Sequence, residues 1–99
     1  MSFLMAQPEV LDAAAGELHG INTAVRDSTS AAATPTTLVV PAAADLVSIL
    51  TAAQFSSHAE RFQMISAQAA AVREQLATTL GISAGSYAAT EFANSSAVG

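Results

Sequence analysis

One pentapeptide has the spacing of a catalytic motif. Residues Gly81-Ile82-Ser83-Ala84-Gly85 match G-x-S-x-G, in which a serine nucleophile sits on a sharp turn between a strand and a helix. That chemistry needs a histidine–acid pair, and in that fold the histidine follows the serine in the chain. Here a helix is expected before the motif, and His19 and His58 both precede Ser83. We therefore expect the glycines to loosen or end a helix, and we expect no enzyme activity.

The two histidines are the strongest metal-ligand candidates, and they are weak ones. The chain contains no cysteine, and no spaced pair of carboxylates accompanies either histidine. We expect neither a metal nor another cofactor. His19 is expected to be solvated, whereas His58 is expected to lie near Phe55 and Phe62 as a hydrogen-bonded interface residue.

Tyr87 and Glu91 form a third pattern, near the end of the chain. Residues four apart on a helix share a face, so an aromatic ring and a carboxylate would be displayed together. As a bare pattern it is common, and a tyrosine packed on its own helix beside a solvated glutamate explains it equally well. Its meaning depends on the surrounding chain.

The composition limits what the chain can bind and how well it folds alone. Of its 99 residues 52 % are hydrophobic, but nearly half of these are alanine, so a single core would be marginal. The net charge of −5, with three Arg and no Lys, disfavours nucleic acid and anionic membranes. The start lacks the basic segment of a secretory leader, and the longest uncharged stretch contains Pro35 and Pro41, which argues against a membrane helix.

The first helix is predicted from about residue 8 to about residue 34. Pro8 suits a first helical position, and Glu9 and Asp12 place negative charge beside the positive end of the helix dipole. Three- and four-residue steps then define an apolar stripe, and Pro35 disfavours helical backbone in the residue before it. The stripe consists of Leu11, Ala14, Leu18, Ile21 and Val25.

The segment from about residue 35 to about residue 44 is predicted to be an extended linker. The alternative is a short strand at 36–40. Asp45 is a plausible N-cap for a second helix over about 45–84, which is followed by a tail over about 85–99. This helix carries two apolar stripes that together are wider than one neighbouring helix covers. The first holds Val47, Phe55, Phe62, Ile65, Ala69, Val72, Leu76 and Leu80; the second holds Leu46, Leu50, Ala53, Met64 and Ala71.

A two-helix hairpin buries one seam, so the remaining apolar surface must face water or another protein. The alternative is that the second stripe is chance, since alanines on a solvated helix are harmless. We expect an all-α fold, an antiparallel two-helix hairpin whose leftover surface is covered by a partner.

The sequence also resembles the mycobacterial PE family along its whole length. The matching residues include Met1-Ser2-Phe3, the Pro8-Glu9 pair, Ala33-Thr34-Pro35-Thr36-Thr37, Val40-Pro41-Ala42-Ala43-Ala44-Asp45, Leu50-Thr51-Ala52-Ala53-Gln54-Phe55 and Gly85-Ser86-Tyr87-Ala88-Ala89-Thr90-Glu91. Similarity is greatest to the short PE-domain-only proteins of the ESX-5 type VII secretion system.

This resemblance implies a single PE domain over residues 1–99 that completes a four-helix bundle with a PPE-family partner. It implies export of the pair by an ESX machine, to the outside or the cell surface, with an EspG-type chaperone acting through the PPE subunit. Tyr87 and Glu91 would then be the Y-x-x-x-[DE] secretion signal. The residues expected at the partner interface are Leu11, Leu18, Ile21, Val25, Phe55, Phe62, Ile65, Val72 and Leu76.

A hypothesis of a different class remains beside this one. The chain could be a self-associating helical scaffold or adaptor with no role in export. Concentration-dependent homodimers formed without any partner would favour it.

Overall fold

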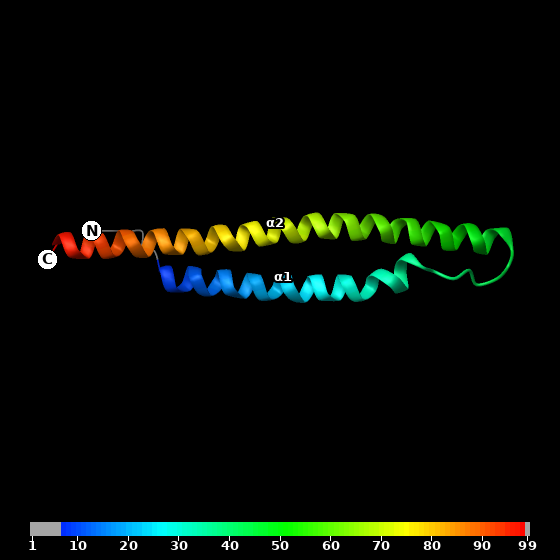
Figure 1. Ribbon diagram of the computed structural model, residues 1–99, viewed down its shortest axis with the longest axis horizontal. Helices are drawn as coiled ribbons and strands as arrows, with labels where there is room; N and C mark the ends of the chain where they lie inside the picture. The colour runs from blue at the N-terminus through cyan, green and yellow to red at the C-terminus, as the bar shows by residue number, and fades with distance from the viewer. Residues whose placement is uncertain (1–6, 99) are drawn as a thin grey trace. The chain divides into compact units, whose positions relative to one another are not determined.

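The computed structural model describes residues 7–98, and two helices account for nearly all of them (Figure 1). Helix α1 spans Pro8–Thr37 and helix α2 spans Leu46–Val98. The predicted all-α hairpin is confirmed, since the two helices pack against each other. The Met1-Ser2-Phe3 part of the family pattern lies outside the described residues.

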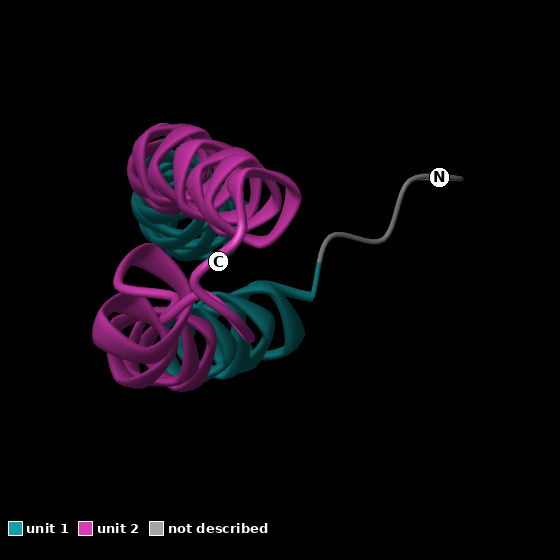
Figure 2. Cartoon of the chain, turned by 90° about the vertical axis from the view of Figure 1, so that its right-hand side faces the viewer, with its two compact units in different colours: residues 1–22, 72–99 teal, residues 23–71 magenta. Residues whose placement is uncertain are grey.

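The chain divides into two compact units, coloured separately in Figure 2. Unit 1 comprises residues 1–22 and 72–99, so it joins the first half of α1 to the last part of α2. Unit 2 comprises residues 23–71, which hold the rest of α1, the connection and the first part of α2. In each unit a segment of α1 therefore packs on a segment of α2 that runs in the opposite direction.

The end of α1 differs from the prediction. The helix continues through Pro35 to Thr37, although we expected it to stop near residue 34. Proline removes one backbone N–H from the helix interior. Two hydroxyls bond carbonyls of the same turn: Thr36 Oγ1 donates to Ala32 O at 2.5 Å and Thr37 Oγ1 donates to Ala33 O at 2.6 Å. These bonds reinforce the last turn of the helix, but neither of them reaches Ala31 O, the carbonyl to which Pro35 cannot donate.

The connection over residues 38–45 is irregular, so the alternative of a strand at 36–40 is wrong. It is tied to unit 2 by Val39, whose N–H donates to Ser56 Oγ at 3.3 Å. Asp45 caps α2 as predicted: the Ser48 N–H donates to its Oδ1 at 2.9 Å and the Ser48 hydroxyl donates to its Oδ2 at 3.0 Å. These two bonds lower the pKa of the Asp45 carboxyl below its ordinary value.

Helix α2 is longer than predicted. It does not end near residue 84 but continues through Gly81 and Gly85 to Val98. A glycine inside a helix costs only about 1 kcal/mol relative to alanine, which neighbouring helical residues can offset. The segment predicted to be a tail is therefore helical over residues 85–98, and all of its side chains are exposed.

The residues that α2 turns toward α1 are mostly small. They are buried or half-buried at alternating steps of three and four residues, the spacing of an antiparallel helix pair. The seam on α2 contains Ala52, Ser56, Ala59, Gln63, Ser66, Ala70, Arg73, Ala77, Leu80 and Ala84. On α1 the buried residues are Pro8, Ala15 and Asn22. Small side chains allow two helix backbones to approach closely, so this packing buries little apolar area per residue.

The cap at Asp45 predicts that the free energy of unfolding depends on pH. Because the folded-state pKa of Asp45 is lowered, its stabilising effect is complete above the unfolded value of about 4 and is lost as the pH falls through the lower folded value. Unfolding measured between pH 7 and pH 2 should show this loss. Asp45→Asn keeps an oxygen acceptor without a titrating group, so the stability difference between the two proteins should shrink in acid. A difference that is constant with pH would contradict this role.

The close seam predicts that added volume is not tolerated. Ala77 has 0 % of its surface exposed. Ala77→Leu should therefore destabilise the hairpin by about 1–3 kcal/mol in chemical denaturation, because the helices must separate. Thr78→Leu places the same side chain at an adjacent exposed position and should change stability by no more than about 0.5 kcal/mol. Equal effects of the two substitutions would show that the seam is not tightly packed.

Candidate partner-binding surface

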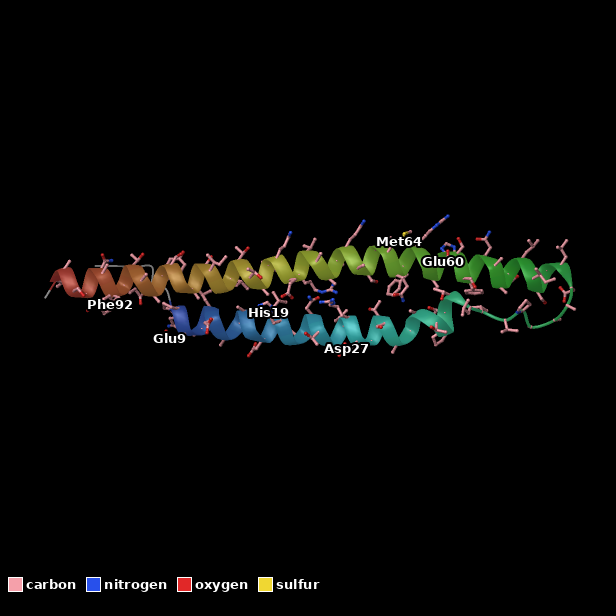
Figure 3. The ribbon with its side chains drawn as sticks, in the orientation of Figure 1. Glu9, His19, Asp27, Glu60, Met64 and Phe92 are labelled. Carbon is pink, nitrogen blue, oxygen red and sulfur yellow. The ribbon has the colours of Figure 1, made fainter. Side chains whose placement is uncertain are left out.

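In unit 2 the large apolar side chains of α2 face solvent. Phe55 is 63 % exposed, Phe62 57 % and Ile65 64 %. Most members of both predicted stripes are exposed, because the seam is formed mainly by small residues that lie between them. Nor is the exposed surface confined to one face: Met64 projects from α2 on the side away from α1, as does Glu60 (Figure 3).

A shallow apolar cavity of about 390 Å³ lies on unit 2, where α1, the connection and α2 meet. Its walls are almost entirely apolar, and His58 is the only side chain with a titratable group among them. The lining residues are Ala32, Pro35, Thr36, Val39, Phe55, His58, Ala59 and Phe62. A second hollow of about 430 Å³ shares Phe55 and His58 with it and adds Leu50, Thr51 and Gln54. Phe55 and His58 therefore line both apolar hollows and lie between them.

The first cavity also shows which sides of the two helices lie together in unit 2. Ala32 of α1 lines the same hollow as Phe55 and Phe62 of α2. On α1, Val25 is seven residues before Ala32 and so occupies the same side of the helix. Val25 is exposed as well. Val25, Phe55 and Phe62 therefore lie on the side of this unit that carries the cavity.

Unit 1 exposes a smaller apolar set. Ile21 of α1 and Val72 and Leu76 of α2 are each more than half exposed. Leu11 and Leu18, which we also predicted at the interface, are half-buried beside the seam. Of the nine predicted interface residues, these two are thus partly used by the hairpin itself. The other seven are exposed.

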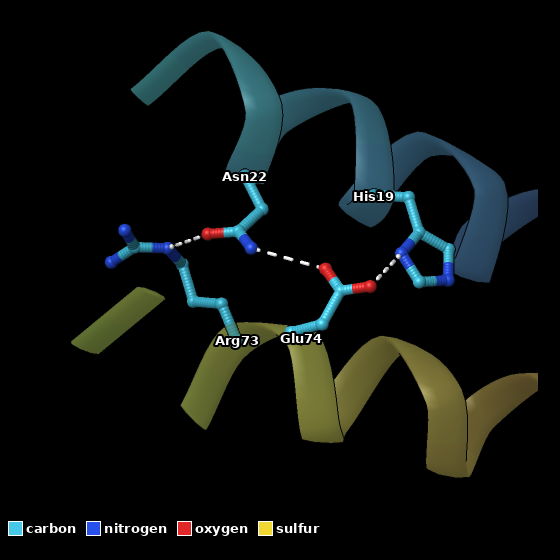
Figure 4. A network of polar contacts seen from close by, with 4 residues as sticks. All are labelled: His19, Asn22, Arg73 and Glu74. Atoms are coloured by element: carbon cyan, nitrogen blue, oxygen red, sulfur yellow. Dashed lines mark hydrogen bonds and ion pairs between the residues drawn. The ribbon is translucent and has the colours of Figure 1, made fainter. Parts of the chain in front are cut away.

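A polar network crosses the seam of unit 1 (Figure 4). Asn22 of α1 is only 1 % exposed, and it bonds α2 at both ends of its amide. Its Nδ2 donates to Glu74 Oε2 at 3.1 Å, and its Oδ1 accepts from Arg73 Nε at 2.8 Å. His19 Nδ1 lies 3.0 Å from Glu74 Oε1. His19 is therefore half-buried and partnered, and the prediction that it is solvated is wrong.

Sequence reasoning missed this network, although a signal for it exists. Asn22 follows Pro8, Leu11, Ala15 and Leu18 at the same alternating steps, so it interrupts a stripe of apolar residues with an amide. Arg73 interrupts the small-residue seam of α2 in the same way, between Ala70 and Ala77. Two polar residues at seam positions of two helices are candidates to meet.

Within the part of the chain that the structure describes, neither the G-x-S-x-G motif nor the histidines are arranged as a catalytic or metal-binding site. Ser83 is half-buried inside α2, so it does not stand on a strand-to-helix turn. No group of three or more His, Cys, Asp or Glu residues within 7–98 could hold a metal. No helix among these residues is both long and apolar enough to cross a membrane.

Tyr87 and Glu91 lie one turn apart on the exposed end of α2. Both follow Ala84, which is the last buried residue of the helix. Tyr87 is about half exposed. The ring and the carboxylate are therefore presented on the same helical segment, on one face of it.

The chain belongs to the PE family, whose family model matches residues 4–94. The PE family protein PE13 of Mycobacterium tuberculosis is 57 % identical over 97 residues, which are 98 % of each chain.

Longer proteins of the same species share this region. The PE family protein PE8 is 50 % identical over 97 residues, which cover 98 % of this chain but 35 % of PE8. The PE-PGRS family protein PE_PGRS33 is 50 % identical over 94 residues, which cover 95 % of this chain and 20 % of that protein. In these relatives the matching region is thus a small part of a longer chain.

Proposed function

We propose that this protein pairs with a PPE-family protein in a four-helix bundle and carries the type VII secretion signal that exports the pair. Family membership supports the general role. The observation that carries the proposal is the exposure of Phe55, Phe62 and Ile65 on a hairpin whose seam buries mainly alanine. Such a surface is costly in water and is covered when a second protein packs on it.

The exposed area has the scale of a stable interface. The chain exposes 7349 Å². A folded monomer of 10.0 kDa exposes about 5,200 Å², so the excess is roughly 2,000 Å². Obligate interfaces bury about 2,000–5,000 Å² over both partners, so about 1,000–2,500 Å² would be removed from this chain. Covering the apolar side of the hairpin would therefore account for much of the excess.

The partner surface that fits unit 2 is apolar and uncharged. Residues 46–59 contain no Asp, Glu, Lys or Arg, so a charged partner would find no counter-ion here and would lose its hydration. The cavity of about 390 Å³ beside Phe55 and Phe62 would accept a large apolar side chain from a partner helix. This requirement is met by the apolar stripe of an amphipathic helix pair.

The export part of the proposal depends on Tyr87 and Glu91. Both lie beyond the last buried residue of α2, so a partner on the hairpin would leave them accessible to another protein. A secretion ATPase or coupling protein of an ESX machine would read the ring and the carboxylate together, while an EspG-type chaperone would hold the PPE subunit. The exported pair would act outside the cell or at its surface.

Phe62→Asp tests the interface. An aspartate at this position would place an unpaired charge in the covered surface, so the co-expressed complex should be lost or weakened at least about 100-fold, as judged by size exclusion and a binding titration. Gln68→Asp adds the same charge at another exposed residue of α2 and should leave binding within about threefold.

Two results would contradict the proposal. Full binding by Phe62→Asp would exclude this side of α2 as the interface. Stable homodimers of the wild-type chain in the absence of a partner would instead support a self-associating scaffold.

Tyr87→Ala and Glu91→Ala test the signal. Each should leave the complex assembled, because neither residue contacts the seam, but each should abolish export of both subunits. Comparing the two proteins in culture filtrate and cell lysate would measure this. Ser86→Ala is a matched control at an exposed neighbouring residue and should be exported normally. Unchanged export of both signal variants would overturn this assignment.

A further inference from the structure

The seam between the helices does little to select one alignment over another. On α2 its residues recur at a spacing that averages three and a half, and most are alanine or serine. A slide of α1 by seven residues along α2 would again set small side chains against small side chains, and uniform packing of this kind specifies register poorly. Such a slide moves the helices by about 10 Å. The eight residues of the connection can span up to about 27 Å, so they do not prevent it.

The network around Asn22 is a polar feature of the seam that does not repeat. The other hydrogen bond between α1 and α2, from Gln63 Nε2 to the Thr29 carbonyl at 3.0 Å, uses a backbone acceptor of a kind that every residue of α1 supplies. Its amide uses a donor and an acceptor at the same time, toward Glu74 and Arg73. Those two adjacent residues supply the matching acceptor and donor, so the network also defines the orientation of the amide. His19 adds a third contact from α1 to the same carboxylate.

A slipped alignment would remove these partners. Seven residues further along α2, Leu80 and Gly81 have no polar side-chain atom. Seven residues earlier, Ser66 and Ala67 offer a single hydroxyl. Asn22 is almost fully buried, and a buried amide without partners is strongly unfavourable.

We infer that Asn22, with His19, Arg73 and Glu74, sets the register in which α1 and α2 pack. The network selects one alignment among several that the small-residue seam would otherwise tolerate. Buried polar groups are known to act in this way in paired helices. The register also decides which exposed apolar residues of α1 and α2 become neighbours, and so shapes the outer surface of the hairpin. The inference does not depend on the identity of any partner.

Engineered cysteine pairs can report the register, because the chain has no cysteine of its own. His19 meets Glu74, so one turn back along α1 and one turn forward along α2 bring Ala15 near Ala77. Ala15→Cys with Ala77→Cys reports the observed register. Ala15→Cys with Ala70→Cys or with Ala84→Cys reports a slip of seven residues in either direction. All four alanines are buried, so the three pairs are matched.

Disulfide formation would be followed by mass in dilute full-length protein. With the native network, the 15/77 pair should form at least roughly tenfold faster than either slipped pair, the effect of one well-formed coupling. Asn22→Ala should reduce that preference to about threefold or less. Gln75→Leu, at an exposed polar residue of α2, is the control and should preserve it.

A second variant separates register from stability. Asn22→Leu, Arg73→Leu and Glu74→Leu together replace the network with apolar groups, which should keep helicity in circular dichroism but lose the register preference. Retention of the tenfold preference in both variants would overturn the inference. Loss of helicity in both would overturn it too, because the network would then be a source of stability alone.

Discussion

Close approach of two helices along small side chains is the constraint on which the rest of this structure depends. Alanine and serine face the seam in both units, and Ala77 is completely enclosed. Because these residues are short, most of the larger Phe, Ile, Leu and Val side chains lie outside the seam, although Leu11, Leu18 and Leu80 are half-buried along it. The hairpin thus gains little from burying its own apolar surface, and it retains a surface suited to another protein.

This division of residues separates the contacts that hold the two helices together from the apolar surface that the hairpin leaves exposed. The interior holds the polar network, which depends on hydrogen-bond geometry and has one satisfactory arrangement. The exterior holds Phe55 and Phe62 beside an open apolar cavity, where contact depends on shape and area. The polar contacts between the helices and the exposed apolar surface are therefore formed by different side chains.

The two ends of α2 differ in structure: the first turn is capped, and the last segment is fully exposed. At its start, Asp45 caps the helix by accepting a hydrogen bond from the Ser48 N–H, one of the free N–H groups of the first turn. Its last part, residues 85–98, has no buried side chain and yet remains helical. In that position Tyr87 and Glu91 are spaced by the helix rather than by contact with the seam. Both side chains are therefore accessible beyond the packed part of the hairpin.

The sequence by itself determined the two helices, the cap at Asp45 and membership of the PE family. These depend on local chemistry, since periodicity, proline positions and side-chain caps act within a few residues. It also indicated that apolar surface exceeds what two helices can bury. The ends at Thr37 and Val98 were not predicted, because the helices continue through Pro35 and through Gly81 and Gly85, whose local preferences favour an earlier end.

Only the tertiary structure decided which face of each helix turns inward. Periodicity assigns angles around one helix axis, but it does not say whether the large or the small stripe will meet a neighbour. Here the small stripe does, because it lets the backbones come close and brings Asn22 to Arg73 and Glu74 across the seam. That choice depends on contacts between residues about fifty positions apart, which no local pattern contains.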